Sequence, residues 1–189
     1  MKLILIRHGE TEANRKRVYY GSTDVPILPE SADELKKLAE SGIYPKVERY
    51  YTSGMRRAEQ SFSALFGDTP HEVLPGMREL NFGDFEMRPY EELKNDPAFR
   101  EWIKGDIEKN VCPNGESGEM VTARALAALE PVIRDGRDAL IVTHGGVIGG
   151  VMNSFFPNEN GRYLYTPDPG RGYILSFDGM NPVSYTELK

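Results

Sequence analysis

Short apolar runs that alternate with amphipathic segments organise the chain. The first run, from Leu3 to Ile6, is continuous and closes on polar residues, which is typical of a short buried strand. By the same reasoning, strands are expected at residues 2–7, 49–52, 139–143, 172–177 and 183–188. Apolar positions at helical spacing predict helices over residues 31–39, from just after Ser53 to about residue 66, and over 118–133, with another after residue 144. Strands that alternate with helices favour an α/β fold, a three-layer α/β/α sandwich with a mostly parallel central sheet.

Local signals place the ends of the helices and one insertion. Ser31 with Glu34 has the spacing of a capping box, and Ser53 is expected to cap the next helix, which Gly67 ends. Residues 75–113 are rich in charge, proline and aromatic side chains, with short helical pieces expected at 90–94 and 98–103. We therefore expect one domain over residues 1–189, with a lid insertion at about 75–113.

Composition narrows the class of protein. A chain of 189 residues can bury a substantial core, and 39% hydrophobic with 28% charged residues is an ordinary globular composition. The net charge of -6 disfavours a nucleic-acid surface, although a local cluster of arginines can still hold a small phosphorylated metabolite. Cys112 is the single cysteine, and the first apolar run is too short for a signal peptide or a membrane span. We expect a cytoplasmic protein with no membrane or nucleic-acid partner; the oligomeric state stays open.

The first candidate constellation follows the first predicted strand. Arg7, His8 and Gly9 stand where that strand ends, and Asn14 comes a few residues later. A neutral imidazole can attack phosphorus if cationic neighbours hold the phosphoryl oxygens and keep the ring unprotonated. Gly9 would let the backbone approach an oxyanion, so that its amide could donate to phosphate. Alternatively, His8 only caps the strand and Arg7 is a solvated charge.

Two further strand ends carry similar chemistry. Arg56 and Arg57 open the helix after the 49–52 strand, and one of them can serve as a bidentate phosphate clamp. His144 follows the 139–143 strand, and Gly145 with the next glycine makes room for a bound group. Ligands in open α/β sheets bind beyond the carboxyl ends of the strands, which is where all of these residues fall. The choice between Arg56 and Arg57 stays open.

A segment rich in carboxylates supplies candidate proton donors. Cleavage of a phosphate ester releases an alkoxide, so an acid is needed near the leaving group, and Glu79, Asp84 and Glu86 all qualify. They could equally form a solvated loop. Four aromatic residues near these segments could stack on a heteroaromatic leaving group or belong to the core of the lid: Tyr19, Tyr20, Phe85 and Trp102.

Together, these segments resemble the histidine phosphatase superfamily, also called the phosphoglycerate mutase-like family. The resemblance covers nearly the whole chain, with six motifs in order at residues 7–11, 21–27, 53–61, 77–86, 115–117 and 143–146. Four positions depart from the family's usual residues, namely Gly54 for proline, Met87 for glycine, Gly149 for a frequent arginine and Ser31 for a frequent glycine.

The resemblance implies a role for each matching residue. It makes His8 the nucleophile and Glu79 the proton donor, and its register favours Arg57 over Arg56. It places the phosphate pocket on Arg7, Arg57 and His144, with Asn14 and Gly145 as further substrate contacts. No metal and no other cofactor is implied, since members of the family use positive side chains where other phosphatases use metal ions.

The resemblance also sets the choice among functions. The family contains phosphatases and mutases, and mutases typically carry an additional segment for which 189 residues look too few. The runs at 82–88 and 112–116 are similar to those of the α-ribazole phosphatases of cobalamin biosynthesis. We therefore expect a metal-independent phosphatase that hydrolyses a small phosphate monoester, with α-ribazole 5'-phosphate as the candidate substrate. A phosphoglycerate mutase and a catalytically inactive phospho-ligand binding module are the alternatives.

Overall fold

A six-stranded, mostly parallel sheet forms the centre of the computed structural model, which describes residues 1–106 and 108–189. The strands of the main sheet are β1 (Lys2–Arg7), β3 (Arg49–Thr52), β4 (Glu72–Val73), β6 (Ala139–Thr143), β7 (Gly172–Asp178) and β8 (Asn181–Leu188). Their order is β4-β3-β6-β1-β7-β8. Strands β4, β3, β6 and β1 are parallel to one another, whereas β7 pairs antiparallel with both β1 and β8. The α/β class predicted from the sequence is confirmed.

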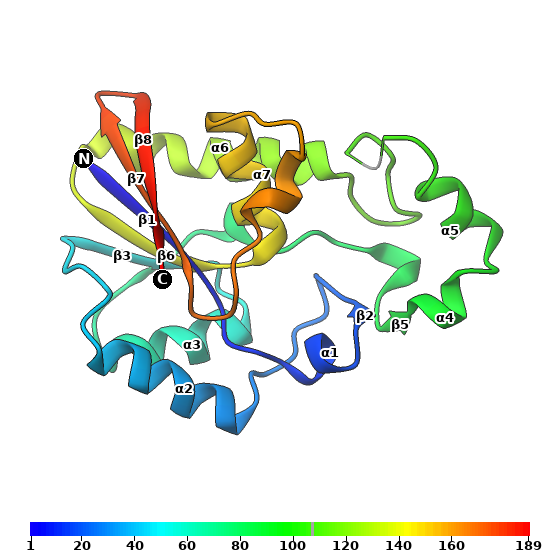
Figure 1. Ribbon diagram of the computed structural model, residues 1–189, viewed down its shortest axis with the longest axis horizontal. Coiled ribbons are helices and arrows are strands. Elements are labelled where there is room, and N and C mark those ends of the chain that lie inside the picture. Colours follow the sequence, from blue (N-terminus) through cyan, green and yellow to red (C-terminus); the bar gives the residue numbers. More distant parts are fainter. Residues whose placement is uncertain (107) are drawn as a thin grey trace.

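Helices cover both faces of this sheet. The longer helices are α2 (Pro29–Glu40), α3 (Arg56–Phe66), α6 (Gly118–Asp135) and α7 (Gly145–Phe155). In Figure 1, α2 and α3 lie below the sheet and α6 and α7 above it, which gives three layers. The sequence explains this arrangement, because successive residues of a strand point to opposite faces. Leu3 and Leu5 pack in the cluster with α6 and α7, whereas Ile4 and Ile6 pack in the cluster with α2 and α3.

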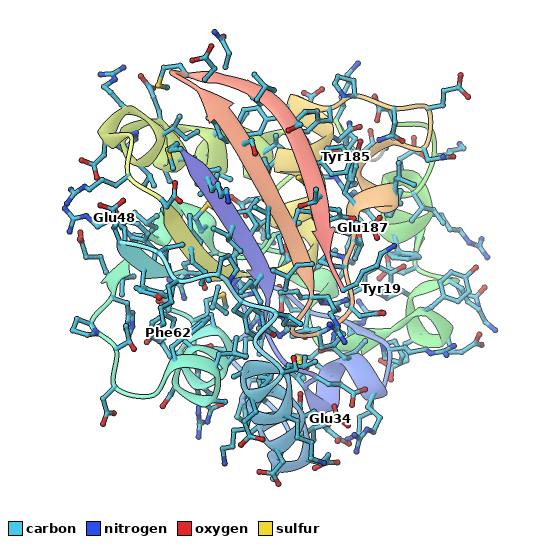
Figure 2. The ribbon with its side chains drawn as sticks, turned by 60° about the vertical axis from the view of Figure 1, so that its left-hand side comes forward. Tyr19, Glu34, Glu48, Phe62, Tyr185 and Glu187 are labelled. Atoms are coloured by element: carbon cyan, nitrogen blue, oxygen red, sulfur yellow. The ribbon has the colours of Figure 1, made fainter. Side chains whose placement is uncertain are left out.

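Labelled side chains in Figure 2 mark the layers and the two ends of the sheet. Phe62 lies on the face covered by α2 and α3. Tyr185 and Glu187 come from β8, and Glu48 stands just before β3, toward the opposite edge. Tyr19 lies on the side of the molecule where the carboxyl ends of the parallel strands emerge, and there it faces the segment of residues 75–113.

The 75–113 segment extends to one side of the sheet, on the right in Figure 1. Its regular elements are η1 (Pro75–Met77), η2 (Gly83–Phe85), β5 (Arg88–Pro89), α4 (Tyr90–Leu93) and α5 (Pro97–Trp102), where η marks a 3-10 helix. Strand β5 pairs with β2 (Val18–Tyr19), next to the short helix α1 (Glu12–Arg15). Phe85, Phe99 and Trp102 pack into the same cluster as α6 and α7, so the segment is anchored to the core. A further 3-10 helix, η3 (Gly161–Tyr165), packs on α7.

Both helix starts that were predicted from serine are wrong. Helix α2 begins at Pro29, whose fixed φ suits the first turn, and Ser31 lies inside the helix. Helix α3 begins at Arg56 with Met55 as its N-cap and no side-chain cap. Both serines are buried, and their hydroxyls serve the loops around the strand ends, as described next. The predicted end of α3 at Gly67 is confirmed.

Candidate active site

Three parallel strands deliver the predicted site residues to one edge of the sheet. Arg7 ends β1 and pairs in register with Thr143, which ends β6. Thr52, at the end of β3, pairs with the residue before Thr143. His8 and His144 therefore emerge side by side, with their ring centroids 5.1 Å apart at an interplanar angle of 59°.

His8 is held as a neutral imidazole with one free nitrogen. Its Nδ1 lies 2.6 Å from the Gly9 carbonyl oxygen, which can only accept, so Nδ1 carries the proton and Nε2 keeps its lone pair. Burial, and then the charge of Arg57, hold the pKa of His8 well below its usual value, with Arg7 acting in the same direction. The Gly9 carbonyl opposes this effect without reversing it. The ring has the ionisation state that a nucleophile requires.

The structure gives a different reason for glycine at position 9 from the one predicted. Its N–H donates to Ser61 Oγ at 2.8 Å, and the next amide, of Glu10, donates to Ser31 Oγ at 2.7 Å. These amides are therefore engaged inside the protein, and the expectation that they serve a phosphate is wrong. A Cβ at Gly9 would stand 2.7 Å from Ser31 Oγ and 2.9 Å from Leu35 Cδ1, so glycine is required because α2 packs directly against this turn.

His144 is fully buried and forms hydrogen bonds through both ring nitrogens. Arg57 Nε donates to its Nδ1 at 3.2 Å, so the ring proton sits on Nε2, which donates to Ser53 Oγ at 2.8 Å. Burial, Arg57 and His8, in that order, hold the pKa of His144 well below its usual value. Ser53 also accepts the Met55 N–H at 3.3 Å, which explains its position ahead of α3 without a capping role.

Arg57 lies inside the site, and Arg56 lies outside it. The Arg57 side chain is completely buried, and its two terminal nitrogens donate to Thr23 O at 3.0 Å and Gly21 O at 2.6 Å. Its Cζ lies 5.0 Å from the centroid of the Tyr20 ring. Arg56 is exposed, and its main-chain N–H donates to Asp24. Three of the five N–H groups of Arg57 are thus occupied, which leaves two for an anion.

The three candidate acids occupy different places. Glu79 lines the cavity, where its carboxylate accepts the Gly146 N–H at 3.0 Å and the Leu80 N–H at 2.9 Å. Asp84 is exposed and accepts from Asn114. Glu86 is outside the cavity lining and organises a loop, since it accepts the N–H groups of residues 21, 22 and 23.

The pKa of Glu86 is lowered, which suits its role as a hydrogen-bond acceptor for that loop. Burial raises the pKa of its carboxyl, but hydrogen bonds from Thr23 Oγ1 and the Phe82 N–H outweigh burial and lower the pKa overall. The loop that Glu86 holds presents the carbonyl groups of Gly21 and Thr23 to Arg57. Glu86 therefore acts on the site indirectly, through the loop that positions Arg57.

The remaining predicted contacts also line the cavity. Asn14 accepts the Thr11 N–H at 3.0 Å and the Tyr20 hydroxyl at 2.8 Å through Oδ1, which leaves its Nδ2 to donate. Gly145 leaves room for Arg7, because a Cβ there would lie 3.3 Å from Arg7 Nε. The next glycine leaves room for Glu79 in the same way, with 2.6 Å to Oε1. The two glycines thus make room for protein side chains, and both also line the cavity.

A cavity of about 320 Å³ joins these groups. The predicted residues that line it are Arg7, His8, Asn14, Arg57, Glu79 and Gly145, together with the aromatic Tyr19, Tyr20 and Trp102. His144 lies directly behind them, in contact with Arg57. Phe85 is buried and packs edge-on against Phe99 with centroids 5.3 Å apart, so it belongs to the core of the 75–113 segment and not to the cavity wall.

Sequence reasoning missed one side of this cavity. Glu108, Arg162, Tyr163 and Thr166 also line it. Glu108 lies within the predicted lid, but nothing singles it out among the many acids there. Arg162 belongs to η3, far from any motif, and the one hint was Gly149 in place of a frequent arginine. A Cβ at Gly149 would lie 2.6 Å from Arg162 O, so η3 sits directly on that glycine.

Comparison with known proteins agrees with this geometry. The sequence pattern described as "Histidine phosphatase superfamily (branch 1)" matches residues 3–184. The chain belongs to the histidine phosphatase superfamily. The resemblance inferred from the six motifs is thereby confirmed.

Relatives within the superfamily are named as phosphatases or as mutases. An adenosylcobalamin/alpha-ribazole phosphatase of Salmonella typhimurium is 31% identical over 154 residues, covering 78% of this chain and 76% of the relative. A 2,3-bisphosphoglycerate-dependent phosphoglycerate mutase of Cytophaga hutchinsonii is 28% identical over 204 residues, covering 98% and 93%. The crystal structure of the alpha-ribazole phosphatase from Shigella flexneri superposes with a TM-score of 0.85 at 24% identity, covering 96% of this chain and 93% of that one, which establishes the fold.

The described residues contain neither a membrane-spanning helix nor a group of metal ligands. None of the helices in residues 1–106 and 108–189 has the length and apolar character to cross a membrane. Within those same ranges, no three or more His, Cys, Asp or Glu side chains are grouped so that they could hold a metal ion. The charged side chains that line the cavity are those of Arg7, Arg57, Glu79, Glu108 and Arg162.

Proposed function

We propose that this histidine phosphatase superfamily member hydrolyses a small phosphate monoester through a phosphohistidine on His8. One observation carries the proposal: a neutral His8, with Nε2 free, shares a single cavity with Arg7, Arg57 and the carboxyl group of Glu79. Nucleophile, charge stabilisation and a proton donor are the three functions that such a reaction needs.

In the first displacement, His8 Nε2 attacks phosphorus while the bond to the leaving-group oxygen breaks. Arg7 and the two unoccupied N–H groups of Arg57 hold the non-bridging oxygens, whose charge increases in the transition state. Glu79 gives its proton to the departing oxygen. We assign that transfer to Glu79 because it lines the cavity, whereas Asp84 and Glu86 do not. The bond from His8 Nδ1–H to the Gly9 carbonyl stabilises the charge on the phosphorylated ring.

In the second displacement, water attacks the phosphoryl group and the phosphorus–nitrogen bond breaks. The Glu79 carboxylate, now without its proton, accepts one from the water, and inorganic phosphate leaves. His8 and Glu79 return to their starting states, so the cycle consumes only ester and water.

His144 contributes through Arg57. In this arrangement its Nδ1 accepts the Arg57 Nε–H, and its own proton goes to Ser53. A neutral His144 thus fixes the guanidinium without adding a competing negative charge, so the full charge of Arg57 remains available to the phosphoryl group. We assign it a positioning role.

We further propose a leaving group that carries a heteroaromatic ring, with α-ribazole 5'-phosphate as the first candidate substrate. Two observations support this choice: the relative from Salmonella typhimurium is named for that activity, and Tyr19, Phe82 and Trp102 line the cavity. Aromatic walls favour a flat heteroaromatic group. Because Phe82 and Trp102 belong to the 75–113 segment, we propose that this segment acts as the lid over the leaving group.

Mutase activity is the second candidate, favoured by the mutase relative that covers nearly the whole chain. That alignment runs over 204 residues and this chain has 189, so the mutase carries inserted residues that are absent here. An inactive binding module has less support, because His8, Arg57 and Glu79 are all in place.

A phosphate-release screen tests the proposal. The purified protein is incubated with phosphorylated metabolites that include α-ribazole 5'-phosphate, phosphoserine and 3-phosphoglycerate, and both released phosphate and isomerised product are measured. Release from at least one monoester, lost in His8→Gln, supports the hydrolase. Isomerisation of 3-phosphoglycerate without phosphate release would identify a mutase instead.

A further inference from the structure

An ion pair between an arginine and a glutamate lies in the cavity wall, outside the proposed phosphate pocket. Arg162 of η3 is 8% exposed, and its Nη2 donates to Glu108 and, at 3.1 Å, to Thr122 Oγ1. Glu108 belongs to the 75–113 segment, so the pair joins that segment to η3. Neither residue takes part in the mechanism proposed above.

Gly146 fixes where this pair stands relative to the chemistry. Its N–H donates to Glu79 Oε2 at 3.0 Å, and its carbonyl accepts from Arg162 Nη1 at 3.3 Å. Gly146 therefore lies between the Glu79 carboxylate and the Arg162 guanidinium. Arg162, Tyr163 and Trp102 line the same cavity. Because Glu79 protonates the leaving group in the proposed mechanism, we infer that the leaving group lies near Arg162.

Among the described acids, Glu108 alone forms an ion pair with Arg162. Its Nε is buried without a hydrogen-bond partner in the described part of the chain. A buried guanidinium with a spare donor attracts any carboxylate or phosphate that reaches it. Here the Glu108 carboxylate, whose side chain is 35% exposed, already pairs with the guanidinium. A second anionic group on the substrate would compete with that carboxylate for Arg162 and would be repelled by it.

We propose that Glu108 is a specificity-determining residue that excludes leaving groups with a second anionic group. The cavity then accepts monophosphates whose leaving group is uncharged, and it rejects bisphosphates and carboxylated phosphates. The inference rests on the proposed function for the position of the leaving group. It gives a physical reason why this chain would favour hydrolysis of a neutral ester over a mutase substrate, which carries a carboxylate.

Binding of a matched pair of phosphonates tests Glu108 directly. Benzylphosphonate and 4-carboxybenzylphosphonate differ by one carboxylate, cannot be hydrolysed, and can be titrated calorimetrically into each variant. Glu108→Gln keeps the size of the side chain and removes its charge, which leaves Arg162 free for the ligand. We expect the affinity ratio of the carboxylated to the neutral ligand to rise about 10- to 100-fold, the usual size of a hydrogen bond between charged groups.

Two further variants make the result specific. In Glu108→Gln/Arg162→Gln the cation is gone, so the gain should shrink to the part that comes from removing the Glu108 charge. Glu119→Gln is the matched control, because its main-chain N–H donates to the Glu108 carbonyl at 2.9 Å while its side chain is exposed. Its affinity ratio should stay within twofold of the wild type. Benzylphosphonate binding verifies that each variant is folded.

The outcomes separate the two proposals. A ratio in Glu108→Gln within twofold of the wild type, or wild-type protein that binds the carboxylated ligand as well as the neutral one, overturns the role of Glu108. If Glu108→Gln shows the expected shift in affinity ratio but the wild-type protein releases no phosphate from any monoester of the screen, the hydrolase is refuted and the charge selection stands.

Discussion

The Nε–H group of Arg57 donates to Nδ1 of His144 across 3.2 Å, in a site where both side chains are fully buried. Only a neutral imidazole with its proton on Nε2 can accept that bond. The bond therefore sets the tautomer of His144 and aims the guanidinium at the cavity. Carbonyl groups of Gly21 and Thr23 fix the other end of the guanidinium.

This geometry predicts different consequences for two neighbouring arginines. Arg57→Lys keeps the charge but cannot reproduce the three fixed bonds, so kcat/KM for p-nitrophenyl phosphate should fall about 100- to 1,000-fold, as when one oxyanion donor is lost. Arg56→Lys is the control and should stay within twofold, since Arg56 is exposed. Equal losses in the two variants would place the phosphate outside the Arg57 pocket.

The proposed acid role of Glu79 predicts a dependence on the leaving group. Glu79→Gln should slow hydrolysis of an alkyl phosphate by about 100- to 10,000-fold, because an alkoxide needs a proton as it departs. The same variant should lose far less on p-nitrophenyl phosphate, whose phenolate leaves without help. Asp84→Asn, at an exposed position, should change neither rate. If Glu79→Gln slowed both substrates equally, Glu79 would be a positioning residue.

The two buried histidines predict a loss of stability in mild acid. Their pKa values are held well below the usual 6.5, so below about pH 6.5 the unfolded chain binds protons that the folded chain does not. The free energy of unfolding should therefore fall as pH decreases from about 6.5, by about 1.4 kcal/mol per pH unit for each histidine, until the folded-state pKa is reached.

Substitution isolates the contribution of His144. Urea unfolding of His144→Gln at several pH values should give a slope against pH shallower by about 1.4 kcal/mol per unit between roughly pH 6 and 5. Above pH 7.5 the two slopes should coincide, which serves as an internal control for the stability that the substitution itself removes. Parallel slopes in mild acid would mean that His144 is protonated in the folded protein.

Much of the fold was predictable because β1 and β6 are buried strands with continuous apolar runs, and α3 and α6 carry periodic apolar faces. The positions of His8 and His144 followed from the strand ends that precede them. Local signals failed where tertiary contacts compete, since the hydroxyls of Ser31 and Ser53 bond across the site rather than capping helices.

The leaving-group side of the cavity could not be predicted in the same way. Arg162 and Glu108 stand 54 residues apart in the sequence and meet only because η3 packs against α7 and the 75–113 segment folds back over it. Neither residue lies at a strand end or in a motif. Long-range ion pairs of this kind leave no periodic signal in a single sequence.

Trapping the phosphorylated protein tests the central claim most directly. Protein mixed rapidly with a radiolabelled phosphate ester and stopped with alkali should carry a phosphoryl group that survives base and is released by acid, as phosphohistidine does. His8→Gln should carry no label and show no turnover, and His144→Gln should retain some labelling with slower turnover. Turnover by the wild type without any trapped phosphoryl group, together with near-normal turnover in His8→Gln, would contradict the account and point to direct attack by water.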